Sequence, residues 1–373
     1  MRHMKREILL INDNLDAGGV EKVLQSLATY LDRKGEQLTI WACNGDREAL
    51  RRLYPAGVKF RKYPFWDAPC RRFTPKWFFF RFCRVLFERL LLKLKRWDVV
   101  IAVKEGPSMI LASRLCAGEK IAWVHTDYSS FHWTEYLFPE PQQERACMEQ
   151  FDHVICVSQS VKQSVIDTVG DPGCLRVLYS PVDYPAILRA AEVPAEDAVR
   201  PSGKPLLVSV GRLSEVKRYD MLINICRELS ARHDFELWIV GGGEQEEALS
   251  RQLKEQDIHC VRLLGQKSNP FPYVACADWV ISSSASESYG LAIQEALILG
   301  KPVLAAYCPA IAESLDPAFG VITGPSREAL TQGLDNILSH PETAERLRAN
   351  LKGYDKSRLF EARLEAIYSL INN

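Results

Sequence analysis

Residues 205–218 read PLLVSVGRLSEVKR, an apolar run that stops at a glycine and continues into a charged turn. Similar apolar runs recur downstream at helix-length intervals, at 235–240, 259–264, 278–282, 301–305 and 319–323. Short apolar runs that alternate with amphipathic segments predict parallel strands joined by crossover helices. We therefore expect a doubly wound α/β domain over residues 205–350.

The N-terminal half of the chain shows the same alternation. Its apolar runs lie at 7–12, 38–43, 98–103, 119–124 and 153–157. They predict a second Rossmann-like domain over residues 1–183, and the Ala-, Pro- and charge-rich residues 184–204 predict a linker. Doubly wound parallel sheets bind ligands at the carboxyl ends of their strands, so two facing domains predict an interdomain cleft.

The composition excludes several classes of protein. The 373 residues include 47 Lys+Arg and 47 Asp+Glu, a neutral balance that argues against a nucleic-acid partner. Hydrophobic residues make up 47% and charged residues 25%, which excludes wholesale disorder. The 11 cysteines are scattered without a Cys-x-x-Cys pair, which predicts reduced thiols and no zinc site.

Charge and apolar length also bear on the location of the protein. No signal-peptide pattern is present, and no apolar run approaches the roughly 18 residues of a membrane span, so we expect a cytoplasmic protein. Residues 71–97 nevertheless combine nine basic residues and one acid, Glu88, with many Phe, Leu and Trp side chains. That mixture predicts peripheral contact with an anionic membrane surface, at the inner face of the plasma membrane. A core helix with solvated basic side chains is the alternative.

Glycine-rich turns bear on which class of nucleotide-containing ligand the protein binds. The run Gly241-Gly242-Gly243 follows a predicted strand, but the third glycine of the dinucleotide fingerprint falls on Glu246. No Walker A sequence is present, so hydride transfer and P-loop chemistry are both disfavoured. Gly18-Gly19 lies at a strand-to-helix turn, where backbone N–H groups can approach a phosphate.

Charged residues after two of the predicted strands suit a phosphorylated sugar ligand. Arg212 and Lys217, five positions apart, can neutralise a diphosphate. The segment 282–303, SSSASESYGLAIQEALILGKPV, places Glu287 in a loop and Glu295 in the following helix. Carboxylates accept hydrogen bonds from paired sugar hydroxyls. The alternative is that Glu287 caps this helix and Glu295 is solvated on its surface.

Together these segments resemble a known enzyme family. GRLSEVKR (211–218), GGGEQEEAL (241–249), LLGQ (263–266) and the Glu-x7-Glu segment resemble the donor half of retaining family-4 glycosyltransferases of the GT-B fold. GGVEK (18–22) and WVHTD (123–127) extend the resemblance through most of the chain. The resemblance implies that residues 351–373 form a helix that crosses back to the N-terminal domain.

The resemblance also implies roles for individual residues. Arg212 and Lys217 would hold the donor diphosphate, Glu287 the hydroxyls of the donor sugar, Glu295 the ribose, and His125 the transferred sugar. The remaining donor-binding positions lie in glycine-bearing turns, in the nucleobase loop and at the start of a helix, and they are Gly19, Gly211, Gly242, Gln266, Tyr289, Gly290 and Leu291.

The implied reaction moves a sugar from a UDP-sugar or GDP-sugar to a glycan or lipid-linked acceptor in cell-surface polysaccharide or glycolipid synthesis. The anomeric configuration is retained in the family, and no metal or other cofactor is expected. A non-catalytic sugar-nucleotide-binding subunit and a sugar-nucleotide epimerase are the alternatives. The sequence departs from the family in the serine-rich stretch before Glu287 and in the aromatic tract 63–82, which has no assigned counterpart.

Overall fold

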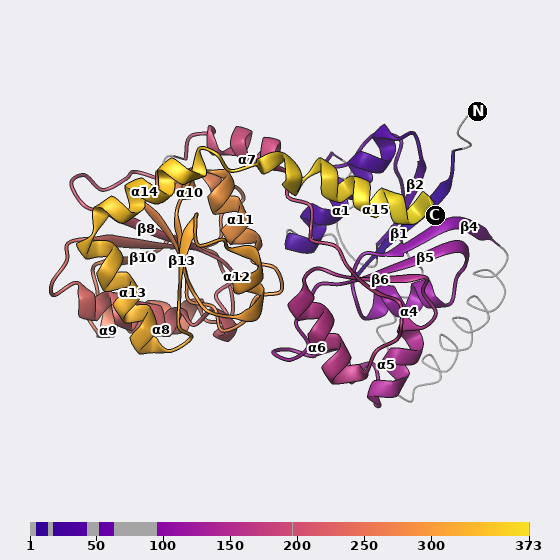
Figure 1. The fold of residues 1–373 in the computed structure, drawn as a ribbon, viewed down its shortest axis with the longest axis horizontal. Coiled ribbons are helices and arrows are strands. Elements are labelled where there is room, and N and C mark those ends of the chain that lie inside the picture. The colour runs from indigo at the N-terminus through magenta and orange to yellow at the C-terminus, as the bar shows by residue number, and fades with distance from the viewer. Residues whose placement is uncertain (1–4, 14–17, 43–51, 63–94, 196, 373) are drawn as a thin grey trace. The chain divides into compact units, whose positions relative to one another are not determined.

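The computed structural model describes residues 5–13, 18–42, 52–62, 95–195 and 197–372. The chain divides into two compact units, and each contains one parallel sheet with helices (Figure 1). The first unit comprises residues 1–181 and 361–373, and the second comprises residues 182–360. The prediction of two parallel-sheet α/β domains is confirmed.

In the described part of the first unit, seven parallel strands form one sheet, in the order β3-β2-β1-β4-β5-β6-β7. The strands are β1 (Glu7–Asn12), β2 (Gln37–Ala42), β3 (Lys59–Lys62), β4 (Arg96–Ala102), β5 (Cys116–Val124), β6 (His153–Cys156) and β7 (Leu175–Val177). The sequence analysis missed β3 and β7. β3 reads KFRK and β7 has only three residues, so neither presents an apolar run.

The helices of the first unit include one from the far end of the chain. They are α1 (Gly19–Arg33), α4 (Pro107–Ser113), α5 (Pro141–Met148), α6 (Gln159–Val169) and α15 (Glu361–Asn372). Helix α15 lies beside α1 (Figure 1). Polar contacts fasten it there, because Arg6 Nη1 donates to the carbonyl of Ile371 at 2.6 Å and Tyr368 Oη donates to Glu36 at 2.9 Å.

In the second unit the sheet has the order β10-β9-β8-β11-β12-β13. Its strands are β8 (Leu206–Val210), β9 (Glu236–Val240), β10 (Val261–Leu263), β11 (Trp279–Ser282), β12 (Val303–Ala306) and β13 (Gly320–Thr323). Each overlaps a run predicted from the sequence. The helices are α7 (Tyr184–Ala191), α8 (Tyr219–Leu229), α9 (Glu246–Glu255), α10 (Phe271–Cys276), α11 (Leu291–Ile298), α12 (Pro309–Ser314), α13 (Arg327–Ser339) and α14 (Pro341–Leu351).

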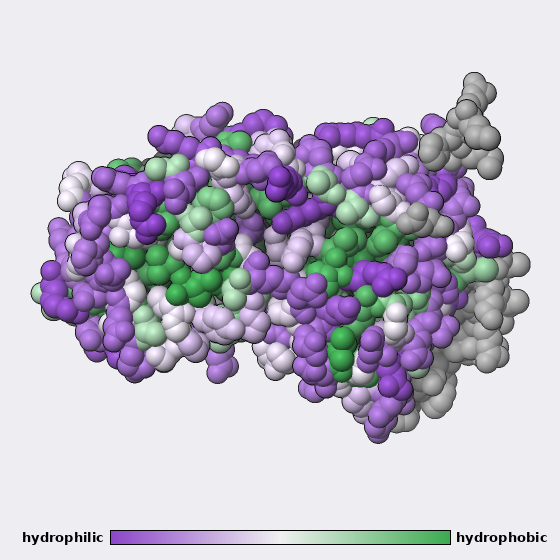
Figure 2. Space-filling model, in the orientation of Figure 1, coloured by the Kyte–Doolittle hydropathy of each residue, from purple (hydrophilic) through white to green (hydrophobic). Residues whose placement is uncertain are grey.

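Helices cover both faces of this second sheet. Leu207 and Leu237 pack into a core cluster with α8, α9 and α13, whereas Leu206 and Trp238 pack into a cluster with α10 and α11. A strand that is buried on both faces has no polar side to show, which explains why its sequence reads as a continuous apolar run. The hydrophobic residues visible in Figure 2 form patches within each unit, and hydrophilic residues cover most of that face.

Residues 184–204, expected as a linker, begin with helix α7, which contacts α10 and α11 of the second unit. Most of the basic segment 71–97 lies outside the described residues, which resume at Lys95 and enter β4 at Arg96. Among the described helices, none combines the length and the hydrophobicity that a bilayer span requires.

Candidate functional site

The candidate site lies where the strand order of the second sheet reverses. Strands β8 and β11 are hydrogen-bonded neighbours, with Leu207 opposite Trp279, although β9 and β10 intervene in the sequence. The loops that follow β8 and β11 therefore leave the sheet in opposite directions. In doubly wound folds ligands bind beside the strand ends at such a reversal.

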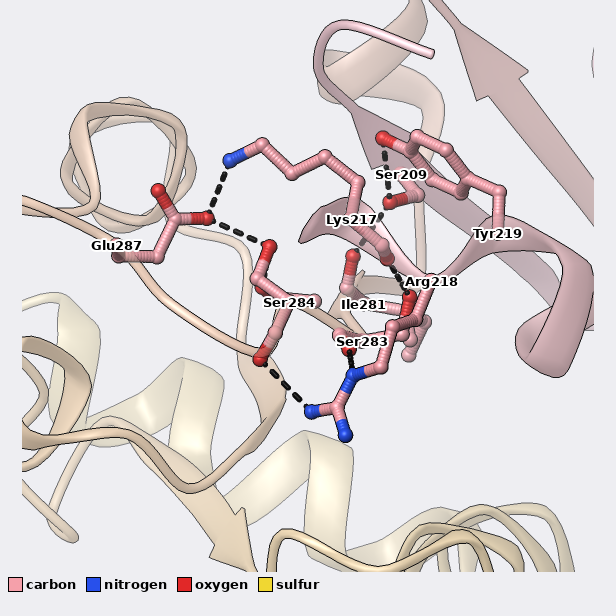
Figure 3. A network of polar contacts seen from close by, with 9 residues as sticks. Ser209, Lys217, Arg218, Tyr219, Ile281, Ser283, Ser284 and Glu287 are labelled. Carbon is pink, nitrogen blue, oxygen red and sulfur yellow. Dashed lines mark hydrogen bonds and ion pairs between the residues drawn. The ribbon is translucent and has the colours of Figure 1, made fainter. Parts of the chain in front are cut away.

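These two loops bring Lys217 and Glu287 into contact, 70 residues apart in sequence (Figure 3). Lys217 Nζ lies 2.6 Å from Glu287 Oε1, and the two side chains are 21% and 17% exposed. Ser284 Oγ donates to the same carboxylate oxygen at 2.7 Å. The ion pair lines a small pocket together with Ser209, Tyr219 and Ser283. The pocket thus offers an ammonium for phosphate oxygens and a carboxylate for sugar hydroxyls.

Hydrogen bonds between the loops hold this pair. Ser283 Oγ donates to the carbonyl of Lys217 at 2.6 Å, and the Arg218 guanidinium donates to the carbonyls of Ser283 and Ser284 (Figure 3). The sequence analysis did not assign Arg218, Ser283 or Ser284 to the site. The serine-rich stretch before Glu287 is the sequence feature that could have indicated these contacts, because serine hydroxyls at a strand end can hydrogen-bond to a neighbouring loop.

Glycine loops form the adjoining part of the site. The hydrogen bond from Leu213 N–H to the Gly242 carbonyl, at 2.9 Å, joins the loop after β8 to the loop after β9. A Cβ at Gly241 would lie 1.9 Å from the Gly211 carbonyl oxygen, so only glycine fits there. A Cβ at Gly242 would lie 3.3 Å from Gln266 Cβ. The structure therefore brings the predicted residues Gly211, Gly242 and Gln266 together.

Arg212 is placed differently from Lys217. Its side chain is 74% exposed, and Nε lies 3.1 Å from Glu244 Oε2. Exposed ion pairs contribute little to stability, so a bound anion can readily displace Glu244. The two predicted cations thus belong to one loop but contact different carboxylates.

The start of helix α11 supplies backbone donors. Gly290 is its N-cap, with φ 76° and ψ 49°, and Leu291 is its first residue. The unpaired N–H groups of a helix N-terminus favour an anion. Tyr289, just before, is buried at 5% exposure. Glu295 is also buried, at 9% exposure, which excludes the alternative of a solvated surface carboxylate.

In the first unit His125 follows strand β5 and is half-buried. Its Nε2 lies 2.9 Å from the Val103 carbonyl, so Nε2 carries the hydrogen of that bond. Its backbone N–H donates to Glu105 at 2.9 Å. Burial lowers the pKa of His125, with a smaller opposing effect of Glu105, so the imidazole is neutral near pH 7. Gly19 is the first residue of α1 and is exposed.

Two carboxylates of the first unit were missed by the sequence analysis. Glu105 is fully buried and accepts hydrogen bonds from Thr126 and from Trp133 Nε1, in addition to His125. Asp13, just after β1, accepts from the Ser108 N–H at 3.0 Å. Burial raises the pKa of Asp13 to about 6. Neither belongs to a motif, because their pairing partners lie about 20 residues or more away in sequence.

Within the described ranges, no three His, Cys, Asp or Glu side chains form a group that could hold a metal ion. The eight described cysteines are free thiols. The candidate site of the second unit consists of the Lys217–Glu287 pair, the glycine loops and the start of α11. In the first unit, His125 lies after strand β5.

Known proteins match both units. Residues 17–184 match the family described as Glycosyltransferase Family 4, and residues 194–353 match glycosyl transferases group 1. Anabaena Alr3699/HepE, solved in complex with UDP and glucose, superposes with a TM-score of 0.74 at 18% identity, over 98% of this chain and 99% of that one. The chain is a GT-B glycosyltransferase. The fold prediction of a GT-B protein is thus confirmed.

Relatives of this GT-B glycosyltransferase include two bacterial proteins. An uncharacterized glycosyltransferase of Haemophilus influenzae is 23% identical over 369 residues, which cover 95% of each chain. The lipopolysaccharide core biosynthesis glycosyltransferase LpsE of Rhizobium meliloti is 25% identical over 224 residues, or 60% of this chain and 62% of LpsE. The GT-B glycosyltransferase therefore has homologues in lipopolysaccharide biosynthesis.

Proposed function

We propose that this protein transfers a sugar from a nucleoside diphosphate sugar to a glycan or lipid-linked acceptor of the cell surface, with retention of configuration and without a metal ion or other cofactor. The observation that carries the proposal is the Lys217–Glu287 pair at the strand reversal, 2.6 Å apart beside the N-terminus of α11. The relation to LpsE supports the acceptor class.

In the proposed reaction the bond from the anomeric carbon to the β-phosphate oxygen breaks while a bond to the acceptor oxygen forms on the same face. The acceptor proton passes to the leaving phosphate. Negative charge therefore grows on the diphosphate, where Lys217, Arg212 and the amides of Gly290 and Leu291 stabilise it. The amides at the start of α11 and the half-buried Lys217 are held by the fold before the reaction begins, whereas Arg212 leaves Glu244 when the donor binds.

Other residues hold the rest of the donor in this proposal. Glu287 accepts hydrogen bonds from the sugar hydroxyls, Glu295 from the ribose hydroxyls, and Gln266 lines the nucleobase. His125 contacts the transferred sugar as a neutral imidazole. Lys217 and Glu287 contact each other in the structure. When the donor binds in this proposal, Lys217 instead contacts a phosphate oxygen and Glu287 instead contacts a sugar hydroxyl.

We propose UDP-sugars as the first donors to examine, because Alr3699/HepE has been solved with UDP-glucose. GDP-sugars remain the second class, since a Mycobacterium tuberculosis relative, 29% identical over 138 residues, is named as a GDP-mannose-dependent mannosyltransferase. A non-catalytic subunit would not require Lys217 and Glu287 to be in contact. An epimerase would form product without an acceptor, and product analysis in acceptor-free buffer separates that alternative.

The basic segment 71–97 supports a further part of the proposal, peripheral attachment to the anionic inner face of the plasma membrane. Its described residues are Lys95, Arg96 and Trp97; Lys95 and Arg96 are exposed at the start of β4, and Trp97 is buried. Flotation with vesicles tests the attachment. We expect recovery with vesicles that contain phosphatidylglycerol and little recovery with phosphatidylcholine alone, whereas equal recovery would contradict electrostatic docking.

A thermal-shift screen with nucleoside diphosphate sugars tests the function itself. A ligand at 100 times its dissociation constant stabilises the folded protein by about 2.7 kcal/mol. We expect a shift with at least one such sugar and none with the free sugar. Glu295→Ala should abolish the shift, and Glu255→Ala, which changes an exposed carboxylate at the end of α9, is the control. The absence of a shift with every donor would contradict the proposal.

A further inference from the structure

Arg218 occupies a backbone conformation that normally favours glycine. It has φ 50° and ψ 41°, in the left-handed region, and it links the 3₁₀ turn η2 (Glu215–Lys217) to helix α8. Among the described non-glycine residues, only Asp257, at φ 51°, shares a positive φ. Side chains with a Cβ are disfavoured there, and such residues gather at functional sites.

The Arg218 side chain ties three loops together. Its Nε donates to the carbonyl of Ser283 at 2.9 Å and its Nη2 to that of Ser284 at 3.0 Å. Its Nη1 donates to the carbonyl of Pro325, in the loop after β13, at 3.0 Å. The guanidinium therefore joins the loops that follow β8, β11 and β13. Because it is turned toward backbone carbonyls, it does not serve as a ligand of the donor phosphates.

The same loops carry the two charged residues of the site. Lys217 is the residue immediately before Arg218, and Glu287 lies three positions after Ser284. Figure 3 shows the two basic side chains leaving one turn in different directions, with Lys217 reaching Glu287 and Arg218 reaching the serine carbonyls. A further hydrogen bond, from Ala285 N–H to the Val216 carbonyl at 2.8 Å, joins the same two loops after β8 and β11.

We propose that Arg218 is a positioning residue, whose left-handed backbone and triply bonded guanidinium fix Lys217 against Glu287 for donor binding. The inference rests on the proposed function for its catalytic consequence. The left-handed turn separates the directions of the two neighbouring side chains. The guanidinium then locks the β11 loop onto the β8 loop, so that the ammonium and the carboxylate keep their relative places.

Arg218→Gly is the informative substitution, because glycine keeps the left-handed turn and removes only the guanidinium. We expect at least a tenfold loss of kcat/KM for nucleotide release from the active member of a panel of UDP-glucose, UDP-N-acetylglucosamine and GDP-mannose. In the Lys217→Ala background the same substitution should cost less than twofold, because a positioning residue acts through the group that it positions. Asp257→Gly, the matched change at the other left-handed residue, should leave kcat/KM unchanged.

A second measurement does not depend on catalysis. Hydrogen exchange of the Ala285 amide should accelerate at least tenfold in Arg218→Gly and should stay at the wild-type rate in Asp257→Gly. The role of Arg218 would be overturned if the losses of kcat/KM from Lys217→Ala and Arg218→Gly multiplied in the double variant. It would also be overturned if the Ala285 amide exchanged at the wild-type rate in Arg218→Gly. Wild-type protein that releases nucleotide from no member of the panel would count against the proposed function, and the exchange result would still decide the positioning role.

Discussion

At the scale of single residues, the contact between Lys217 and Glu287 has a direct kinetic consequence. In the proposed reaction, Lys217→Ala removes one preorganised positive charge from the leaving diphosphate. Loss of one such donor typically lowers the rate about 100- to 1,000-fold, and we expect kcat to fall within that range. Steady-state transfer assays measure the effect. Lys254→Ala, an exposed lysine at the end of α9, is the control and should retain full activity. Equal activities would contradict the role of Lys217.

Asp13 gives a prediction about pH. Burial raises its pKa from 3.8 to about 6, against weaker opposing effects of Ser108 and Lys104 and a small supporting effect of Glu105. The folded protein therefore holds the Asp13 proton more tightly than the unfolded chain, and stability decreases as pH rises from about 4 to 6. Above pH 6 the ionised carboxylate costs the folded state about 3 kcal/mol.

Asp13→Asn should remove this cost while keeping an oxygen that accepts from Ser108. We expect the variant to be more stable than wild type at pH 7.5 and to lose most of that advantage at pH 4.5. Urea unfolding at both pH values measures the difference. Asp171→Asn, at an exposed turn of the same unit, is the control. An advantage that does not change with pH would show that Asp13 has an ordinary pKa.

Residue-level geometry was only partly predictable from the sequence. Lys217 and Glu287 were both assigned to the site, but their contact joins positions 70 apart and needs the strand order of the folded sheet. Arg218 was missed because a left-handed residue is recognised in a sequence chiefly when it is glycine. Asp13 accepts a hydrogen bond from Ser108, which lies in helix α4 and 95 positions away, so the local sequence pattern does not reveal the contact.

At the scale of elements, helix α15 belongs to the first unit although it is the last helix in the sequence, a placement that the family resemblance implied and that periodicity alone does not give. Ile367 is fully buried there. Truncation of a buried isoleucine typically costs 2–5 kcal/mol, so Ile367→Ala should destabilise the first unit by about that amount. Thermal unfolding should show a lower midpoint for the first unit and an unchanged one for the second. Ser369→Ala, on the exposed side of the same helix, should leave both midpoints in place.

Strands were predictable from the sequence where burial on both faces makes them continuously apolar. Strands such as β8 and β9 are covered on both faces, and their apolar runs marked them in the sequence. β3 was not predicted because three of its four residues are basic, and β7 was not predicted because it has only three residues. The start of helix α11 was predictable from Gly290, whose left-handed conformation ends the loop and precedes the first helical residue, Leu291.

At the scale of the whole molecule, the proposed charge stabilisation predicts how transfer responds to metal removal. In the proposed mechanism, Lys217, Arg212 and the N-terminus of α11 take the part of a divalent ion as the source of positive charge. We expect transfer to keep its rate in excess EDTA, measured by product formation from a nucleoside diphosphate sugar. A rate that falls in EDTA and returns with Mg²⁺ or Mn²⁺ would contradict the metal-independent proposal.

The division of the chain has a consequence for what a deletion would damage. Residues 182–360 form a continuous unit, whereas the first unit needs both residues 1–181 and residues 361–373. Removal of residues 361–373 would therefore uncover the apolar surface of the first unit against which Ile367 packs. The lesion would fall on the unit that carries the opposite end of the sequence, and residues 182–360 would keep every segment that they need to fold.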